Sequence, residues 1–420
     1  MTKTILSAFS LALVLFLTPL TGKIINAQGI PENAHVPDSY IIVFQDSVAN
    51  PIEHASDMAR QHGLSLAYTY SHALKGFSSV IPAARLEKIK NDPSVKFVSQ
   101  DRYVGIDVRP SAKPTPTPVP QPVQQVPKGV LRIGQNLTNT GAGIGIAVLD
   151  TGIDLDHPDL AGNILGNTTC VNRTSTGNDD NGHGTHVAGT IAAIDNSIGV
   201  VGIAPSANLY AVKVLDKRGS GSWSSIICGI DWVTARADII KVANMSLGGG
   251  GSSDNDCGNT DNDALHQAIC RSRDAGVTYV VAAGNENDNA ANHVPAAYND
   301  AVITVSALVD TDGKSGGLGS STGYGADDTF ASFSNYSPTI VDLGAPGVNI
   351  LSTWKGDGYN TISGTSMATP HVAGAAALYI KNNPGSSWSQ VRNGLVSIGE
   401  TSGHTSTSLH PERVVFTGSL

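Results

Sequence analysis

Apolar strands and helices alternate from about residue 124 to the end of the chain, and this alternation constrains the fold more than any other feature. The strands are short runs rich in Val, Ile and Ala, predicted at residues 144–149, 208–214, 240–245, 277–282 and 301–305. The helices among them are predicted at residues 183–193, 224–235, 261–273 and 365–381. Strands that are apolar on both faces are typical of a parallel sheet covered by helices on both sides. We therefore predict an α/β fold with three layers, α/β/α, and a mostly parallel sheet.

A smaller unit precedes this region. Its strand and helix patterns alternate over residues 40–44, 52–62, 66–70, 76–81, 83–91 and 95–100. The order β-α-β-β-α-β is that of a ferredoxin-like α+β sandwich. Many unrelated proteins share this fold, so the order by itself indicates no function.

The chain begins with the features of an export signal. Lys3 gives a basic start, residues 11–17 are all apolar, and Ala27 offers a small residue for cleavage. We expect a signal peptide over residues 1–27 and a secreted, extracellular protein. The alternative is an uncleaved membrane anchor, although an apolar stretch of about 16 residues is short for a bilayer span. No later stretch is long and apolar enough to cross a membrane, so no membrane contact is expected after the signal is removed.

A Pro-rich segment joins the two units. Nearly every second residue from Pro114 to Pro122 is proline, which favours an extended polyproline II linker. We therefore divide the exported chain into a small unit at residues 36–107, a linker at residues 108–123 and a large unit at residues 124–420.

Charge and cysteine content narrow the function classes. The net charge of −9, without a cluster of Lys and Arg, argues against nucleic acid as a partner. Four cysteines in an exported chain permit two disulfides. Cys257 and Cys270 flank a short segment, which favours a bridge between them, and Cys170 with Cys228 follows by elimination. No pair has Cys-x-x-Cys spacing, so a structural role is favoured over a zinc or redox site.

Three side chains stand where acyl transfer by a serine would need them. Such chemistry requires a nucleophile, a base that takes its proton and a carboxylate that orients the base. Asp150 follows a predicted strand, whereas His183 and Ser366 each open a predicted helix. These are the positions at which an α/β sheet gathers functional groups. His183 and His186 also lie three residues apart, as zinc ligands can, but Gly184 stands where the metalloprotease motif has Glu.

The sequence around these residues resembles the subtilase family of serine proteases. The three blocks are Val-Leu-Asp-Thr-Gly-Ile-Asp at residues 148–154, Gly-His-Gly-Thr-His-Val-Ala-Gly-Thr at 182–190 and Gly-Thr-Ser-Met-Ala-Thr-Pro-His at 364–371. Their order, Asp then His then Ser, is the order that the family has. The resemblance implies Asp150 as the orienting acid, His183 as the general base and Ser366 as the nucleophile.

The same resemblance assigns residues that would hold the reacting peptide. Ala-Ala-Gly-Asn at residues 282–285 matches the family's oxyanion block, so Asn285 should donate to the tetrahedral oxyanion beside the Ser366 N–H. Two segments match the edges that flank an extended substrate, with Trp223 and Ile226 near an outer apolar pocket. The implied substrate-binding residues are Gly219, Ser220, Gly221, Ser246, Leu247, Gly248, Ala283 and Gly284. The first pocket, which Ala282 also lines, has no bulk, so the resemblance implies a large apolar side chain before the scissile bond.

A calcium site is implied by a discontinuous set of oxygen donors. Asp159 and Asn196 would contribute side-chain oxygens, and Gln124 matches a ligand near the mature N-terminus. The backbone carbonyls would come from Ile194, Ile198 and Val200. An all-oxygen cage is what Ca²⁺ prefers. An ordinary loop at a helix end is the alternative explanation.

Together these features predict a secreted serine endopeptidase of broad specificity that processes its own precursor. Residues 36–107 resemble the inhibitory pro-domain of the family, which implies that the protease has its own pro-domain as an intramolecular inhibitor, besides polypeptide substrates. We expect a monomer with structural calcium. A non-catalytic relative would need a broken triad, which the sequence does not show, and an esterase would be expected to have a Gly-x-Ser-x-Gly elbow at its nucleophile, which the residues around Ser366 do not match.

Overall fold

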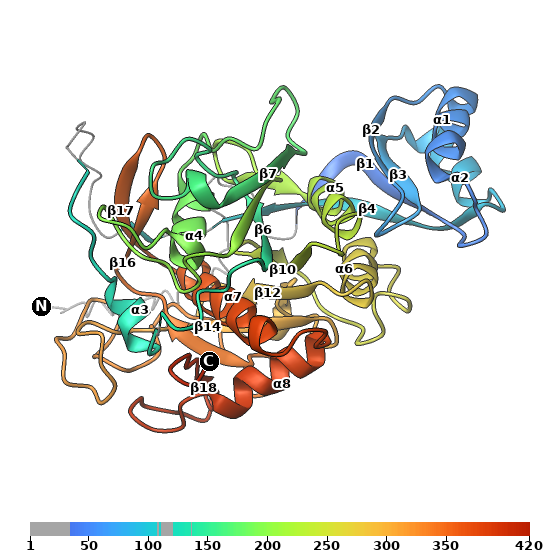
Figure 1. The fold of residues 1–420 in the computed structure, drawn as a ribbon. Coiled ribbons are helices and arrows are strands. Elements are labelled where there is room, and N and C mark those ends of the chain that lie inside the picture. Colours follow the sequence, from blue (N-terminus) through green and yellow to red (C-terminus); the bar gives the residue numbers. More distant parts are fainter. Residues whose placement is uncertain (1–33, 107–108, 111–120, 136) are drawn as a thin grey trace, which may run out of the picture.

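The computed structural model describes residues 34–106, 109–110, 121–135 and 137–420. The predicted signal peptide and most of the predicted linker lie outside these residues. Figure 1 shows a large body that contains the later elements and a small body, at one side, that contains β1 to β4. The two bodies meet near β4 and the helix α5 (Trp223–Thr234).

The large body is built on one eight-stranded sheet. Its strands lie in the order β18-β15-β14-β12-β10-β6-β8-β7, and every neighbouring pair in this sheet is parallel. In chain order the strands are β6 (Gly145–Asp150), β7 (Ile164–Thr169), β8 (Asn208–Lys213), β10 (Ile240–Met245), β12 (Thr278–Ala282), β14 (Val302–Leu308), β15 (Leu343–Pro346) and β18 (Arg413–Val414). The predicted parallel sheet is confirmed.

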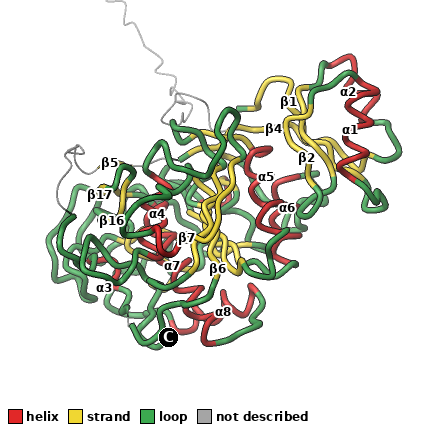
Figure 2. The backbone as a smooth tube through the Cα atoms, turned by 45° about the horizontal axis from the view of Figure 1, so that its top comes forward, coloured by secondary structure: helices red, strands yellow, loops and turns green. Residues whose placement is uncertain are grey.

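Helices cover the two faces of this sheet, as successive residues of β6 show. Ile146 and Val148 pack with α4 (His183–Ala192) and α7 (Thr365–Asn382) in one apolar core. Ala147 and Leu149 point the other way and pack in a second core that includes residues of α5 and α6 (Ala264–Asp274). Because side chains alternate between the faces of a strand, an all-apolar strand must be buried on both sides. Figure 2 shows the strands running between helices in this way.

The small body has the predicted ferredoxin-like topology. Its sheet has the order β2-β3-β1-β4, all antiparallel, and Ile42, Phe44 and Phe77 lie in its core. Gly63 ends the first helix in the left-handed conformation, with φ of 58°. The elements are β1 (His35–Phe44), α1 (Pro51–His62), β2 (Leu66–Tyr70), β3 (Gly76–Val80), α2 (Ala83–Lys90) and β4 (Val95–Gly105).

One predicted helix, at residues 261–273, begins later than predicted, at Ala264. The Asp263 carboxylate caps it there by accepting the Leu265 and His266 N–H groups.

Several other elements have no counterpart among the sequence predictions. The elements that the predictions omitted are β5 (Arg109–Pro110), α3 (Lys128–Arg132), β7, β9 (Ser220–Ser222), β11 (Gly249–Gly250), β13 (His293–Val294), β15, β16 (Ile350–Trp354), β17 (Gly358–Ser363), α8 (Trp388–Ile398), β18 and two 3₁₀ turns (Ala161–Asn163 and Ala290–Asn292).

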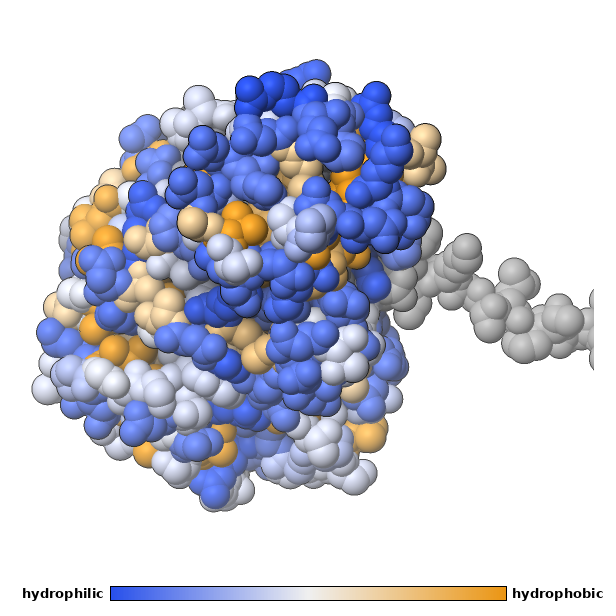
Figure 3. All heavy atoms as spheres, turned by 90° about the vertical axis from the view of Figure 1, so that its right-hand side faces the viewer, coloured by the Kyte–Doolittle hydropathy of each residue, from blue (hydrophilic) through white to orange (hydrophobic). Residues whose placement is uncertain are grey.

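Among the described residues, no helix has the length and apolar character needed to cross a bilayer. Figure 3 views the molecule from the side of the small body and shows a largely hydrophilic face with hydrophobic residues in small separate groups.

Candidate active site

Asp150 and His183 form a buried pair between β6 and α4. Asp150 is the last residue of β6 and His183 is the first of α4. The His183 Nδ1 lies 2.7 Å from Asp150 Oδ1, and both residues are fully buried. The Thr151 N–H donates to the same Oδ1 over 2.7 Å. His183 Nε2 is buried without a hydrogen-bond partner, so an Nδ1–H tautomer that donates to Asp150 leaves Nε2 as the basic nitrogen.

Asp179, which the sequence analysis did not single out, holds the start of α4. Its Oδ1 accepts the Thr151 hydroxyl over 2.9 Å and the Gly182 N–H over 3.0 Å. Its Oδ2 accepts both the N–H and the hydroxyl of Thr185, over 3.0 and 2.6 Å. Burial raises the pKa of this carboxyl, and its hydrogen bonds act in the opposite direction. Asp179 therefore ties the loop that follows Asp150 to the helix turn that carries His183.

Ser366 lies in the first turn of α7 and interacts with Ser246 twice. Its hydroxyl donates to the Ser246 carbonyl over 3.1 Å, and the Ser246 hydroxyl donates to the Ser366 carbonyl over 2.8 Å. The second bond has a simple origin. The Ser366 carbonyl would normally accept the N–H four residues later, but Pro370 stands there and has no N–H. The proline thus frees a carbonyl that links the serine helix to the segment after β10.

Asn285 faces the start of α7 with a defined amide orientation. Its Oδ1 accepts the Thr365 N–H over 2.8 Å and the Thr365 hydroxyl over 3.0 Å. The Nδ2 group is therefore the donor end of the side chain. Gly284, at φ of 107°, makes the turn possible, because a Cβ there would lie 2.2 Å from Asn335 Nδ2. Asn335, another residue that the sequence did not indicate, accepts the Glu286 N–H over 3.0 Å and so holds this loop.

The last strand of the small body lies along the edge of the large body as an added strand. In β4, Tyr103, Val104 and Gly105 pair antiparallel with Ser222, Gly221 and Ser220 of β9. On the same side, the Ile106 N–H donates to the carbonyl of Gly219, which directly precedes β9, over 3.1 Å. On its other side, Gly105 exchanges two backbone hydrogen bonds of 3.1 Å with Gly248. The two segments predicted to flank substrate therefore hold residues 103–106 between them. Figures 1 and 2 show β4 extending from the small body toward the large one.

Side chains of this strand enter apolar surroundings. Val104 and Ile106 belong to the same buried core as Trp223, Ile226 and Leu247. A Cβ on Gly219 would lie 2.4 Å from Ile106 Cγ1, so only glycine leaves room for this side chain.

Two carboxylates fix the small body to α5. Asp101 accepts the Ser224 N–H over 3.0 Å and the Ser224 hydroxyl over 2.6 Å, at the N-terminus of that helix. An anion is favoured there by the N–H groups of the first turn. From the large body, Asp231 accepts the backbone N–H groups of residues 71–73 over 2.7 to 3.2 Å. The interface is thus anchored by charge-assisted hydrogen bonds in both directions.

Asp159 contacts the loop that holds most of the residues predicted to bind calcium, and it does so through N–H groups of that loop. Its Oδ1 accepts from Asn196 Nδ2 over 2.8 Å and its Oδ2 accepts from the Val200 N–H over 2.9 Å. Gln124 reaches the same loop, because its Oε1 accepts the Asn196 N–H over 2.5 Å. The carbonyls of Ser197 and Gly199 accept the N–H groups of residues 124 and 125. The alternate carbonyls, of Ile198 and Val200, accept no backbone hydrogen bond from the described residues, and neither does that of Ile194.

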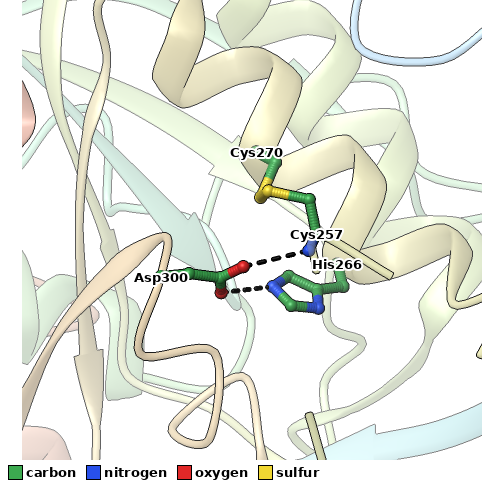
Figure 4. A group of neighbouring side chains, drawn as sticks. All are labelled: Cys257, His266, Cys270 and Asp300. Atoms are coloured by element: carbon green, nitrogen blue, oxygen red, sulfur yellow. Dashed lines mark hydrogen bonds and ion pairs between the residues drawn. A yellow bond between two sulfur atoms is a disulfide. The ribbon is translucent and has the colours of Figure 1, made fainter. Parts of the chain in front are cut away.

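His186, His266 and the four cysteines have contacts that indicate a structural role. His186 Nε2 lies 2.9 Å from the Ile350 carbonyl, and burial lowers the pKa of His186 to about 3. Both predicted disulfides are present, Cys170–Cys228 and Cys257–Cys270. Figure 4 shows the second one beside His266, whose Nε2 lies 2.7 Å from Asp300 Oδ1. Because the two sulfur atoms are bonded to each other, the group of Cys257, His266, Cys270 and Asp300 has no thiolate that could bind a metal ion.

Family models match both bodies. One described as the subtilase family matches residues 141–409, and one described as peptidase inhibitor I9 matches residues 39–107. The chain belongs to the subtilase family and is a serine endopeptidase preceded by an inhibitor-type pro-domain.

Individual relatives agree with this assignment. The chain is 36% identical to alkaline serine exoprotease A of Vibrio alginolyticus, over 90% of this chain and 67% of that protein. It is 45% identical to subtilisin Savinase of Lederbergia lenta, over 67% of this chain and 94% of that protein. The crystal structure of a cold-adapted subtilisin-like serine proteinase matches with a TM-score of 0.57 and 36% identity, covering 70% of this chain and 98% of that one.

Proposed function

We propose that the chain cleaves extended polypeptides through an acyl-enzyme formed on Ser366. His183 Nε2 takes the hydroxyl proton as Ser366 Oγ attacks the scissile carbonyl, and Asp150 holds the imidazole and stabilises its charge. To reach Nε2, the hydroxyl turns away from the Ser246 carbonyl, its acceptor at present. His183 then passes the proton to the leaving amine, and water reverses the sequence to release the acid. Asn285 Nδ2 and the Ser366 N–H donate to the tetrahedral oxyanion.

The observation that carries this proposal is the path of residues 103–106. They occupy the place of a substrate strand, paired on one side with β9 and on the other with Gly248. Strand addition uses main-chain hydrogen bonds, so it accepts many sequences, which fits broad specificity. Leu247 and Ser246 continue this edge toward Ser366, and Ala283 and Gly284 line the first pocket, in which we propose a preference for large apolar side chains.

The same register supports a cut shortly after residue 106. Ile106 directly follows β4 and its N–H donates to the Gly219 carbonyl, whereas Arg109 and Pro110 of β5 pair with Ser363 and Ile362, just before Ser366 in the chain. We infer that residues 36–107 form the inhibitory pro-domain and that the bond between residues 107 and 108 is cleaved. The mature enzyme would then keep the Pro-rich segment at residues 108–123 as an arm before the catalytic domain at residues 124–420.

We propose that calcium stabilises the mature fold at the Asp159 loop. Asp159 is a buried carboxylate that forms no ion pair with a cationic side chain among the described residues, and burial raises its pKa. Asp159, Gln124 and the three alternate carbonyls would supply an all-oxygen donor set of the kind that Ca²⁺ takes, which Asn196 would join once its side-chain oxygen turns away from the Ile198 N–H. Bound there, the ion would cross-link residue 124 to the loop after α4.

Export is the remaining part of the proposal. The basic and apolar start of the sequence supports a signal peptide at residues 1–27, and a relative from Thermus is named an extracellular serine proteinase. We propose a secreted monomer whose only dedicated protein partner is its own pro-domain.

Casein digestion tests the catalytic assignment. The Ser366→Ala variant should leave casein intact and should remain an uncut precursor. Ser363→Ala is the matched control, because the Ser363 hydroxyl accepts the Asn349 N–H over 2.8 Å and has no role in the proposed chemistry. It should clear casein at a rate near that of the wild type. Equal clearing by the Ser366→Ala variant would refute the proposal.

A further inference from the structure

A cluster of carboxylates lies outside the regions discussed so far, in the long loop between β14 and β15. It consists of Asp310, Asp312 and Asp327, and we call it the Asp310 cluster. One oxygen from each side chain lies within 4.8 Å of the others. Asp310 and Asp327 are each only 5% exposed, whereas Asp312 is partly exposed. Three carboxylates this close repel one another unless a cation lies among them.

One oxygen of the cluster is buried without a partner. Asp310 Oδ1 accepts the Gly313 N–H over 3.1 Å, but Asp310 Oδ2 is buried and has no hydrogen-bond donor. A buried carboxylate oxygen left without a donor or a cation is costly, so native structures seldom retain one without a reason.

The cations nearby are engaged elsewhere. Arg132 donates to Asp328 over 2.8 Å and to Glu400 over 2.8 and 3.1 Å. Lys128 Nζ donates to the Thr311 carbonyl over 2.5 Å. None of the three carboxylates of the Asp310 cluster forms an ion pair with a cationic side chain among the described residues. The charge of Arg132 acts on Asp310 only at a distance, because its guanidinium is bonded to Asp328 and Glu400.

The loop backbone holds the carboxylates in place while leaving their outer lone pairs available. Asp327 Oδ1 accepts the Thr311 N–H over 2.7 Å and Asp327 Oδ2 accepts the Gly319 N–H over 2.7 Å. A Cβ on Gly319 would lie 2.2 Å from Thr311 Oγ1, so the approach of this backbone needs glycine. Asp310, Thr311 and Asp312 also line a surface cleft together with Lys128. An ion and its waters can therefore reach the cluster from solvent.

We infer that the Asp310 cluster is a second calcium site, separate from the Asp159 loop. Asp310 Oδ2, Asp312 and Asp327 would be its carboxylate ligands, and water from the cleft would complete the coordination. The donors are all oxygen, which favours Ca²⁺ over zinc, since zinc sites in proteins are usually rich in His and Cys. The ion would fasten the loop at residues 310–327, which carries no strand or helix of its own.

Counting bound ions tests this inference. The full-length Ser366→Ala precursor, which cannot digest itself, is stripped of metal and titrated with ⁴⁵Ca²⁺ at equilibrium. The Asp310→Asn/Asp312→Asn variant should bind one ion fewer per molecule than its parent. Asp238→Asn, the same charge change at an exposed position, should bind as many ions as the parent. Asp159→Asn is then combined with the double variant. If the two sites are separate, the number of ions lost in the combined variant should be the sum of the losses in the Asp159→Asn variant and in the double variant.

Two results would overturn the inference. One is an unchanged number of ions, with unchanged affinity, in the Asp310→Asn/Asp312→Asn variant. The other is a loss in that variant that disappears once Asp159 has been replaced, because both sets of residues would then belong to one site. If the double variant does not fold, Asp312→Asn alone serves, since this residue is partly exposed and keeps an amide oxygen for the Lys314 N–H. It should weaken binding of one ion by at least about tenfold, and unchanged affinity would again overturn the site.

Discussion

At the residue scale, neighbours that are not themselves reactive hold the proposed reacting groups in position. Pro370 removes one helix hydrogen bond, and Ser246 uses the carbonyl that this leaves. Asp179 joins Thr151 to Thr185 and so fixes the distance between the end of β6 and the start of α4. In the proposed mechanism, these bonds would pre-position the side chains at Asp150, His183 and Ser366 before substrate arrives and so would reduce the reorganisation that the reaction requires.

Asn285 offers the sharpest prediction at this scale. Replacing it with Ala should lower kcat by about 10² to 10³ and leave KM nearly unchanged, because its amide would bind only the oxyanion of the transition state. Steady-state kinetics on a peptide p-nitroanilide measures both constants. Asn285→Asp is the informative control, since it keeps an oxygen for the Thr365 N–H but loses the donor. It should lose as much kcat as the Ala variant, and a rate near that of the wild type would show that only the loop contact matters.

At the scale of elements, α7 runs through the middle of the molecule and carries a buried titratable group. His371 is fully buried, its Nδ1 lies 2.9 Å from the Met367 carbonyl, and its Nε2 has no partner. Burial lowers the pKa of His371 to about 4. A Cβ on Gly129 of α3 would lie 2.6 Å from His371 Nε2, so the two elements pack by pairing a glycine with the imidazole.

This histidine should make stability fall in acid. The unfolded chain binds a proton near pH 6.5, but the folded chain does so only near pH 4, so the contribution is complete above pH 6.5 and is lost as the pH falls toward 4. The upper limit is about 3 kcal/mol of unfolding free energy. Urea unfolding of the Ser366→Ala precursor, followed by tryptophan fluorescence between pH 4 and 8, should show a shallower pH slope after His371→Gln. The exposed His35→Gln change should leave the slope as it was, and an unaltered slope in the His371→Gln variant would contradict the prediction.

At the scale of the whole molecule, the pro-domain adds a sheet to the large body, because its last strand β4 pairs with β9 and bonds to Gly248, and we propose that it lies in the substrate groove. Chain order places Asp107 directly after Ile106. An acidic residue suits an apolar first pocket poorly, and the intramolecular arrangement would offset this through its high effective concentration. The first cleavage would then occur because the pro-domain is part of the same chain as the enzyme, and not because the side chain at residue 107 suits the first pocket.

Maturation can be tested from this arrangement. N-terminal sequencing of the mature enzyme should begin at residue 108, and a start beyond residue 121 would contradict the register. Asp107→Leu should speed the appearance of the mature form in a pulse-chase measurement, because an apolar side chain fills the first pocket. Asp57→Leu, at an exposed position of α1 far from the cut in the chain, provides the control and should mature at the normal rate.

Calcium removal also acts on the whole molecule. Excess chelator should lower the melting temperature of the Ser366→Ala precursor and speed self-digestion of the active enzyme. A ligand present at a thousand times its Kd contributes about 4 kcal/mol to the folded state. Differential scanning calorimetry measures the effect, and the Asp159→Asn variant should lose part of the calcium response. An unchanged melting temperature in chelator would count against both proposed calcium sites.

The sequence by itself determined the features that local pattern encodes. Apolar runs such as residues 144–149 must be buried on both faces, so the α/β class follows from them, and the β-α-β-β-α-β order predicted the small body. The blocks around Asp150, His183 and Ser366 indicated the family because they combine glycines and reactive residues in a fixed order. The pairing of Cys257 with Cys270 followed from their separation along the chain.

Only the tertiary structure decided which distant residues meet. The hairpin of β16 and β17 mixes polar and apolar residues, and Ser352 and Thr353 are buried because their hydroxyls donate to carbonyls of α4, so its sequence carries little periodic signal. Asn335 and Asp101 act through backbone N–H groups far away in the chain, and Asp179 acts through the distant Thr151 hydroxyl. An isolated Asp or Asn has no local pattern that reveals such a partner. The same holds for the Asp310 cluster, in which residues 310 and 327 come together only because the loop between β14 and β15 closes on itself. Hydrogen bonds and charge clusters of this kind depend on distances in space, which the order of residues does not specify.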